Sequence, residues 1–326
     1  MKIKDLRTTF ETRLQGHYPL EEVGSFFQMA MDHFLGYSRM DIVLRLEEEL
    51  TEASVKDIQQ LLARLETHEP IQYIIGSTEF YGLPFKVTSD TLIPRPETEA
   101  LVAWILEDQK TKEEASARNK EGRENREKRI EKSEEKRLEN GGDLNESAQN
   151  DTNQSKQPLR SILDIGTGSG CIAVSLAKHL VNAKVAGYDI SQGALETATQ
   201  NAIANEVEVT FTQVDILQTE KLASSFDVIV SNPPYVRELE KQEIQSNVLD
   251  HEPHTALFVS NTDPLLFYRK IGQLAFDNLS GNGRLFFEIN QYLGKETIQL
   301  LKDIGFTNVQ LRKDIFGNDR MIKAWK

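Results

Sequence analysis

Apolar and polar residues alternate in a regular way from residue 159 to residue 326. Short apolar runs, typical of strands, are separated by segments whose apolar residues recur at helical spacing. The run 226–230 is strongly apolar and short, as a strand buried in a parallel sheet should be. The predicted strands are 161–165, 184–188, 207–211, 226–230 and 284–289, with two final strands near Val309 and Met321. The predicted helices are 171–180, 195–204, 265–279 and 295–303.

This alternation predicts the α/β class, with a doubly wound sheet of seven strands. In such sheets, ligands bind outside the carboxyl ends of the strands. Residues that directly follow a predicted strand are therefore the candidates for a functional site. We assign residues 96–326 to this domain.

Residues 1–75 have a helical pattern and are predicted to form a small all-α domain. The clearest helix follows Ser54, a suitable N-cap with Asp57 three residues further on. Its apolar residues recur at helical spacing: Val55, Ile58, Leu61, Leu62 and Leu65. A second buried face is indicated by Phe26, Phe27, Met29 and Phe34, which we expect to be core residues.

Residues 76–95 change to a strand pattern and predict a β-hairpin that links the two domains. The hairpin is expected to turn near Gly82. Pro96 suits the first turn of the next helix, and Glu97 and Glu99 suit its positive end.

Residues 108–157 differ from the rest of the chain in composition. They contain 13 acidic and 12 basic residues, six apolar residues and no aromatic residue. Such a segment cannot bury enough surface to offset its ordering entropy. We expect a charged helix in its first half, disorder in its second half and no catalytic role. The remaining residues carry a net charge of −12, so the acidity belongs to the folded domains.

Charge and composition narrow the possible functions of the 326 residues. The net charge of −13 argues against a broad basic groove, so direct nucleic-acid binding is not expected. The single cysteine, Cys171, excludes an internal disulfide and a multi-cysteine metal site, and we expect no metal. The charged start lacks the apolar segment of a secretory signal, and no run approaches a membrane span. We therefore expect a cytoplasmic monomer without membrane contact.

A glycine-rich loop follows the first predicted strand of the sheet and opens a helix. It consists of Asp164, Ile165, Gly166, Thr167, Gly168, Ser169 and Gly170. Glycines let the backbone approach a ligand closely, and the amides of a helix N-terminus face that ligand. The spacing is Gly-x-Gly-x-Gly, and Cys171 stands where a dinucleotide fingerprint has its third glycine. The alternative is a tight turn with no cofactor.

One carboxylate at the start of this loop, Asp164, favours S-adenosylmethionine over a dinucleotide, whereas the carboxylate of Asp189 suits both cofactors. Asp164 suits a ligand with an amino group and a sulfonium, and it would be poorly placed beside a pyrophosphate. Asp189 ends the second strand and can accept hydrogen bonds from both ribose hydroxyls of an adenosine. Asp215 and Ile216 follow the third strand and could flank the adenine, although a capping role for Asp215 is an equal alternative.

The tetrapeptide Asn232-Pro233-Pro234-Tyr235 directly follows the strand 226–230 and selects the chemistry. A carboxamide nitrogen is a poor nucleophile because its lone pair is delocalised into the carbonyl. The Asn232 side-chain oxygen and the Pro233 backbone carbonyl can hold the two hydrogens of an NH₂ group and turn its lone pair toward a sulfonium methyl. Tyr235 can stack on the flat amide. The alternative is a proline-rich turn without function.

With both motifs placed, the chain resembles the HemK-type family of release factor glutamine N(5)-methyltransferases. The resemblance covers nearly everything except the insert. Its most specific stretch runs from Glu69-Pro70-Ile71-Gln72-Tyr73-Ile74-Ile75-Gly76 through 79–83 to Leu92-Ile93-Pro94-Arg95-Pro96-Glu97-Thr98-Glu99. One departure is Asp263-Pro264, where the family usually has Asp-Gly.

The resemblance implies a class I methyltransferase sheet and a helical substrate-recognition domain. It implies S-adenosyl-L-methionine as cofactor, with S-adenosyl-L-homocysteine as product. It also implies a peptide chain release factor as partner, methylated on the glutamine of its Gly-Gly-Gln loop. Asn232, Pro233 and Tyr235 would be catalytic, and Pro234 would touch the substrate. Arg95 would lie near the substrate entrance, with pairing to Glu97 or Glu99 as the alternative.

Two other functions remain open at this point. An adenine amino-methyltransferase acting on RNA or DNA faces the same lone-pair problem, although it must first expose its base. A release-factor-binding module could use the cofactor only structurally. The acidity of the folded domains disfavours the first, and the tetrapeptide around Asn232 disfavours the second.

Overall fold

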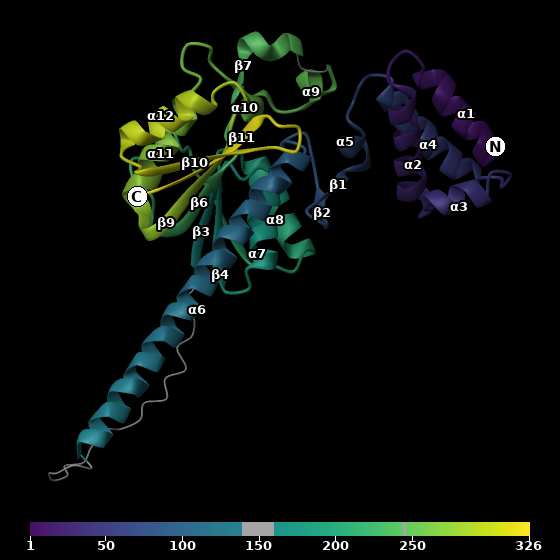
Figure 1. Ribbon diagram of the computed structural model, residues 1–326. Helices are drawn as coiled ribbons and strands as arrows, with labels where there is room; N and C mark the ends of the chain where they lie inside the picture. The colour runs from purple at the N-terminus through teal and green to yellow at the C-terminus, as the bar shows by residue number, and fades with distance from the viewer. Residues whose placement is uncertain (139–159, 244–245) are drawn as a thin grey trace.

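The computed structural model describes residues 1–138, 160–243 and 246–326. A small helical domain at the N-terminus lies to one side of a larger domain that contains the main sheet (Figure 1). A short hairpin in residues 77–86 comes between the two domains along the chain.

Helices packed around one apolar core form the N-terminal domain. They are α1 (Ile3–Leu14), α2 (Leu20–Leu35), α3 (Arg39–Leu44), α4 (Glu52–Leu65) and α5 (Ile71–Ile75). Phe26 and Phe27 are buried in this core, and Met29 and Phe34 pack against it. The all-α prediction for this region and the predicted core face of α2 are confirmed.

The predicted N-cap of α4 is wrong. Ser54 lies inside the first turn of the helix, and Thr51 is the N-cap. The Thr51 hydroxyl accepts a hydrogen bond from the Ser54 backbone N–H at 3.2 Å, which satisfies one of the free amides at the helix start. Both residues are good caps by type, so the helix starts earlier than the apolar pattern indicates.

The hairpin is formed by β1 (Ser77–Phe80) and β2 (Leu83–Lys86), and it turns where the sequence predicts. Both central residues have positive φ, 51° for Tyr81 and 71° for Gly82. A two-residue turn of this kind matches the twist of the strands that it connects. The Tyr81 N–H donates to Glu99 at 2.8 Å, which fixes the hairpin to the start of the next helix.

The described residues of the larger domain contain a seven-stranded sheet in the order β10-β11-β9-β6-β3-β4-β5. The strands are β3 (Arg160–Ile165), β4 (Ala183–Asp189), β5 (Val209–Gln213), β6 (Phe226–Ser231), β9 (Leu279–Glu288), β10 (Asn308–Lys313) and β11 (Asp319–Trp325). The strands from β9 to β5 pair in parallel, and β11 is antiparallel to both of its neighbours. The predicted doubly wound sheet is confirmed.

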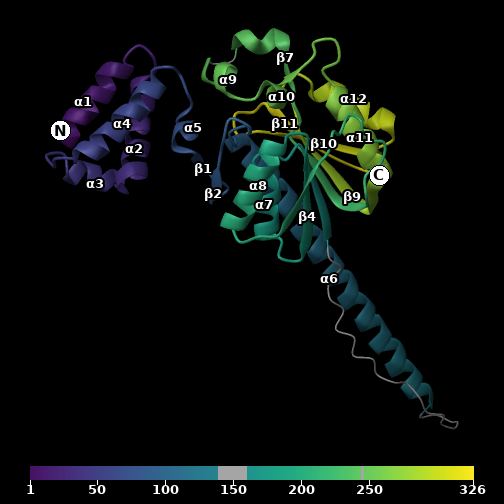
Figure 2. The ribbon, with the colours of Figure 1, turned by 180° about the vertical axis from the view of Figure 1, so that it is seen from behind.

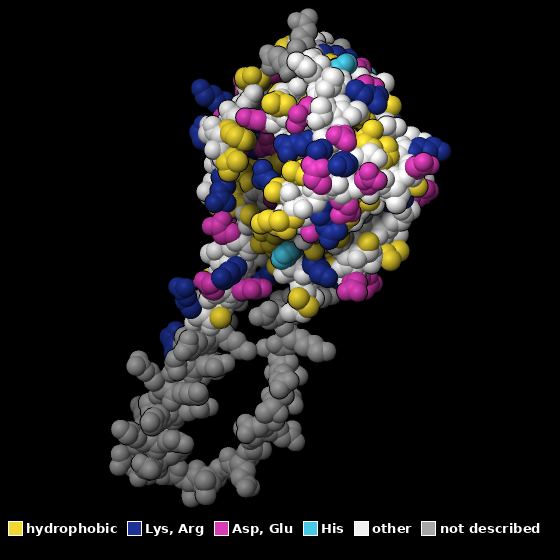
Figure 3. Space-filling model, turned by 90° about the vertical axis from the view of Figure 1, so that its right-hand side faces the viewer, with side chains coloured by type: hydrophobic (Ala, Val, Ile, Leu, Met, Phe, Trp, Pro, Cys, Tyr) yellow, Lys and Arg dark blue, Asp and Glu magenta, His cyan; other side chains and the backbone are white. Residues whose placement is uncertain are grey.

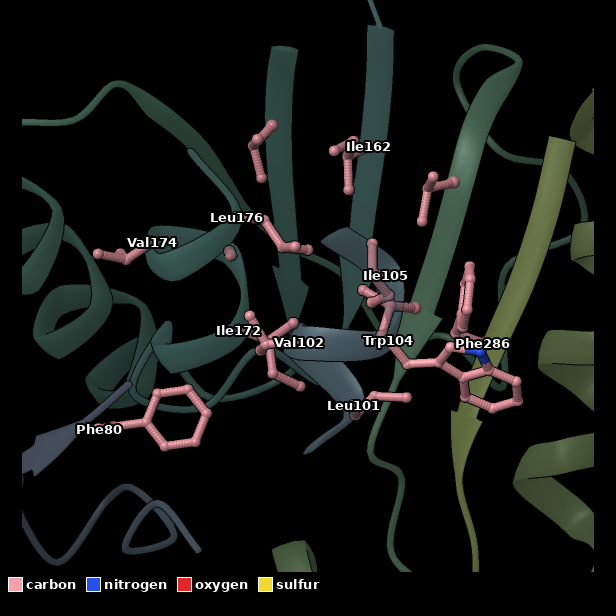
Figure 4. Close-up of a cluster of buried hydrophobic side chains, with 14 of the residues drawn as sticks. Phe80, Leu101, Val102, Trp104, Ile105, Ile162, Ile172, Val174, Leu176 and Phe286 are labelled. Atoms are coloured by element: carbon pink, nitrogen blue, oxygen red, sulfur yellow. The ribbon is translucent and has the colours of Figure 1, made fainter. Parts of the chain in front are cut away.

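Helices cover both faces of this sheet. One face packs against α6 (Pro96–Leu138), α7 (Cys171–His179) and α8 (Gln192–Ala204), and the other packs against α11 (Leu266–Asn278) and α12 (Gly294–Ile304). Each face of the sheet has its own apolar core, the first under α6, α7 and α8 and the second under α11 and α12. Successive strand residues point to opposite faces, so Ile162 lies in the first core and Leu163 in the second. Figure 4 shows the first core, where Val102 and Ile105 of α6 lie against the sheet.

The described residues between β6 and α11 fold over the carboxyl edge of the sheet (Figure 1). It contains β7 (Val236–Arg237), η1 (Glu238–Glu243), α9 (Ser246–His251), α10 (His254–Leu257) and β8 (Phe258–Val259). β7 and β8 pair in parallel and close the segment at its base. We call the described residues of 236–259 the cap. The apolar pattern did not predict any of its elements.

Helix α6 extends well beyond the sheet domain (Figures 1 and 2). The expected charged helix in the first half of the insert is confirmed, because α6 continues to Leu138. The last described contacts of α6 with the sheet domain are Lys112 Nζ to the Asn282 carbonyl at 3.0 Å and Glu113 to Arg160 at 2.8 Å. The disorder predicted for the second half falls mostly on residues 139–157, outside the described residues. No described helix has a stretch both long and apolar enough to cross a membrane.

We expect that deleting residues 115–158 and joining the ends with a short Gly-Ser linker leaves the unfolding temperature unchanged. The ion pair between Glu113 and Arg160 already holds the two ends of this segment together, so a short loop can replace it at little cost in closure entropy. Circular dichroism during heating measures the result.

A longer deletion that starts at Asp108 serves as the control. Asp108 accepts a hydrogen bond from Lys323 Nζ at 2.9 Å, and Lys112 contacts Asn282, so this variant should unfold at a lower temperature. A large drop for the shorter deletion would mean that the segment contributes to the folded core.

Candidate active site

A cavity of about 540 Å³ opens at the carboxyl edge of the sheet. Its size is in the range of small-molecule sites. Its walls come from the glycine loop, the ends of β4 and β5, the loop after β6, the linker at 89–95 and the cap at 253–258. Most of the predicted site residues therefore line one cavity, as expected for a doubly wound sheet, whereas Asp164, Gly170 and Tyr235 are not among its lining residues.

The glycine loop connects β3 to α7 and forms the floor of this cavity. Gly168 has φ of 54°, and a Cβ atom there would stand in open space, with no atom within 4 Å. Gly170 has φ of 79°, and a Cβ atom there would lie only 3.0 Å from Ala198 Cβ. Glycine is thus required by the backbone at both positions and by close packing of α8 at the second. Gly166, Thr167, Gly168 and Ser169 line the cavity, and Gly170 is not among the lining residues.

Asp189 ends β4 and fixes the shape of the glycine loop. One carboxylate oxygen accepts a hydrogen bond from the Gly168 N–H at 2.8 Å, and the other accepts one from the Ser191 N–H at 2.9 Å. Carboxylate oxygens have further lone pairs, and Asp189 lines the cavity. It can therefore hold the loop and still accept hydrogen bonds from a ligand.

Asp164 is fully buried behind the loop and is not among the residues that line the cavity. Thr167 Oγ1 donates to its Oδ2 at 2.7 Å, while its Oδ1 has no hydrogen-bond partner among the described residues. Burial raises the pKa of Asp164 to about 7. A nearby positive charge would therefore stabilise its ionised form strongly.

Asp215 and Ile216 both line the cavity beyond β5. The Asp215 carboxylate also accepts a hydrogen bond from the Leu217 N–H at 2.9 Å, so it caps a turn as well. The two alternatives considered for Asp215 are compatible, because capping uses only part of its acceptor capacity.

The tetrapeptide after β6 is divided between the cavity and the core. Asn232, Pro233 and Pro234 line the cavity, beside the glycine loop. Tyr235 is not among the lining residues. It packs against the second core, and its hydroxyl donates to Glu288 Oε1 at 3.0 Å. Burial, with the adjacent Glu288, raises the pKa of Tyr235 far above its usual range. The Tyr235 side chain thus lies in the core behind the cavity wall and does not face the cavity.

The sequence analysis did not predict a role for two residues behind Asn232. Thr98 contacts Asn232 directly, and Glu288 is connected to it through the Thr98 hydroxyl. Thr98, in the first turn of α6, accepts a hydrogen bond from Asn232 Nδ2 at 3.3 Å. Glu288, at the end of β9, accepts one from the Thr98 hydroxyl at 2.7 Å. Thr98 lies inside the Arg95–Glu99 stretch, which was interpreted as a helix start. The position of Glu288 at a strand end is the only signal that could have identified it.

Arg95 lines the cavity, but neither alternative partner proposed for it is correct. Its guanidinium donates to Glu252 Oε1 at 2.5 Å, and Glu252 is 3% exposed. The other Glu252 oxygen accepts a hydrogen bond from the Ile93 N–H at 3.3 Å. Glu99 is instead bonded to the Tyr81 N–H. Glu252 thus connects the cap to the linker beside the cavity.

Matches to sequence families agree with this architecture. The family model described as Methyltransferase small domain matches residues 128–256, and the one described as PrmC N-terminal domain matches residues 5–76. Together, the doubly wound sheet, the glycine loop and the tetrapeptide beside it define a class I methyltransferase.

Curated proteins with the name Release factor glutamine methyltransferase are similar to this chain over most of its length. The one from Flavobacterium psychrophilum is 48% identical over 324 residues, covering 99% of each chain. Those from Bacteroides thetaiotaomicron and Lactococcus lactis are 38% and 37% identical and cover 95% and 86% of each chain. The chain belongs to the release factor glutamine methyltransferase family.

Proposed function

We propose that this chain transfers a methyl group from S-adenosylmethionine to the side-chain nitrogen of a glutamine. We place that glutamine in the Gly-Gly-Gln loop of a peptide chain release factor. The observation that carries the proposal is that Asn232 and Pro233 line the same cavity as the glycine loop and Asp189. The residues proposed to orient the substrate amide and those proposed to bind the cofactor thus line one small cavity.

The residues of the cavity fit the proposed cofactor. Asp189 has acceptor capacity for ribose hydroxyls, and Gly168 leaves open space where any side chain would intrude. Asp164 Oδ1, which has no hydrogen-bond partner among the described residues, would carry negative charge beside a bound cation, and this favours an amino group and a sulfonium over a pyrophosphate. When bound, S-adenosylmethionine supplies an electrophilic methyl carbon, and S-adenosylhomocysteine is the product.

Asn232 and Pro233 would act by orienting the substrate amide. The Asn232 side-chain oxygen and the Pro233 carbonyl each accept one of the two amide hydrogens, which turns the nitrogen lone pair toward the methyl carbon. Positive charge grows on the nitrogen during transfer, so both acceptors bind the transition state more tightly than the ground state. The proton leaves afterwards, because the charged nitrogen is acidic. Positioning supplies much of the rate.

The remaining predicted substrate contacts are assigned by their place on the cavity wall. Pro234 and Arg95 line the cavity and would contact the loop that carries the glutamine. Tyr235 is behind the wall, so we assign it support of the tetrapeptide in place of stacking on the substrate. The glycines beside the target would let a backbone loop enter a narrow site. We assign substrate recognition to the helical domain.

The charge distribution supports a protein substrate over a nucleic acid. Acidic and basic side chains are intermingled on the face shown in Figure 3, which includes the N-terminal domain. The chain carries 51 acidic and 38 basic residues, which does not favour a phosphate backbone.

Mass spectrometry of release factor from cells with and without this protein tests the proposal. We expect one added methyl group on the Gly-Gly-Gln peptide only when the protein is present. Purified protein with radiolabelled donor should likewise label release factor and leave rRNA and DNA unlabelled. An unmodified glutamine in both cell types, or label on the nucleic acid alone, would contradict the proposal.

A further inference from the structure

A buried chain of hydrogen bonds lies behind Asn232. Asn232 Nδ2 donates to the Thr98 hydroxyl oxygen at 3.3 Å, and that hydroxyl donates to Glu288 Oε2 at 2.7 Å. The Tyr235 hydroxyl donates to the second oxygen of the same carboxylate at 3.0 Å. Thr98 is 2% exposed and Glu288 is 1% exposed. The direction of each hydrogen bond in this chain is therefore set by the neighbouring protein groups and not by bulk water.

The polarity of this chain fixes the orientation of the Asn232 amide. A carboxylate only accepts hydrogen bonds, and a hydroxyl has a single proton to give. Because Thr98 gives that proton to Glu288, its oxygen offers Asn232 only lone pairs. The Asn232 group that faces Thr98 must then be the NH₂, which leaves the carbonyl oxygen for the cavity.

This orientation matters because an asparagine amide rotated by half a turn has nearly the same shape but reversed polarity. With its NH₂ toward the cavity, Asn232 would present donors to a substrate amide that needs acceptors. Such a site would still bind cofactor and protein, but the substrate nitrogen would not be turned correctly.

We infer that Thr98 and Glu288 are positioning residues that hold the Asn232 carbonyl oxygen toward the substrate amide. The inference rests on the function proposed above and adds two residues to it. Tyr235 belongs to the same arrangement, because its hydroxyl donates to the second oxygen of Glu288. Burial raises the pKa of Glu288, as does Glu97 more weakly, while the Thr98 and Tyr235 hydroxyls and Arg320 lower it. The pKa of Glu288 is thus raised overall by burial, while the two hydroxyl donors favour the carboxylate form in which Glu288 accepts both hydrogen bonds.

Steady-state kinetics of Thr98→Val test the inference, since valine keeps the shape of threonine and removes the hydroxyl. We expect kcat for release factor methylation to fall roughly 10- to 100-fold, the range for a misplaced reacting group. The KM for release factor and the calorimetric dissociation constant of S-adenosylmethionine should stay unchanged. Thr98→Ser restores the hydroxyl and should recover most of kcat. Thr98→Ala removes the hydroxyl and the methyl group together, without placing a second methyl where the hydroxyl was, and its kcat should match that of Thr98→Val.

Thr297→Val is the matched control. Thr297 is also fully buried in a helix, but its hydroxyl donates to the Leu293 carbonyl in α12 at 2.8 Å, so kcat should not change. Adding Thr98→Val to Asn232→Ala should cause no further loss, because the group that Thr98 positions is then absent. Wild-type kcat in both Thr98→Val and Thr98→Ala, with Asn232→Ala inactive, would overturn the inference and leave the proposed function intact. Wild-type kcat in Asn232→Ala would instead overturn the proposed function.

Discussion

Asn232→Ala is expected to lose methyl transfer almost completely while it keeps the fold and the affinity for S-adenosylmethionine. The substitution removes one of two acceptors that would bind the developing positive charge on the substrate nitrogen. A preorganised contact of this kind is worth about 2–4 kcal/mol in the transition state. Thr98 and the backbone around Pro233 remain, and Asp189 still holds the glycine loop, so the cavity should keep its shape.

Single-turnover transfer of a radiolabelled methyl group to release factor measures the Asn232→Ala effect, and calorimetry measures cofactor binding. Asn308→Ala is a suitable control, because Asn308 is an exposed asparagine on the edge strand β10. Near-normal turnover of Asn232→Ala would show that the amide is oriented by other groups.

Asp189→Ala is expected to weaken cofactor binding roughly 10- to 100-fold, in line with the 1.5–3 kcal/mol typical of a hydrogen bond to a charged group. The loss has two sources. The ribose acceptors disappear, and the Gly168 and Ser191 amides lose the carboxylate that orders the loop. The same substitution should therefore also lower the unfolding temperature.

Calorimetric titration of S-adenosylmethionine into the Asp189 variants measures this effect. Asp189→Asn keeps one acceptor oxygen in the same shape and should fall between wild type and alanine. An unchanged dissociation constant for Asp189→Ala would mean that the ribose is bound elsewhere.

The sheet and the two motifs at its carboxyl edge could be predicted because their signals are local. Buried parallel strands such as β6 are recognisable as short apolar runs, and strand order then places Asn232 beside the glycine loop. The cap could not be predicted in this way. Its helices α9 and α10 are short, and β7 and β8 are two residues each, so none shows a periodic pattern.

Hydrogen bonds and ion pairs between residues far apart in the chain could not be predicted from the sequence either. Arg95 pairs with Glu252, 157 positions away, although Glu97 and Glu99 are much nearer in the chain. Side chains at the start of a helix point outward around its axis, so closeness along the chain does not make them partners. The same holds for Thr98 and Glu288, which are separated by 190 positions. Tyr235 was predicted to stack on the substrate amide, but its side chain packs against the second core.

Helix α6 has consequences for how this protein can be labelled. Its first turn carries Thr98 at the cavity, and Glu113 meets Arg160 at the start of β3, the opposite edge of the sheet. These two points are about 22 Å apart along the helix axis. A fluorescent protein or affinity tag inserted in the part of α6 between residues 115 and 138 would therefore be attached far from the proposed reacting groups.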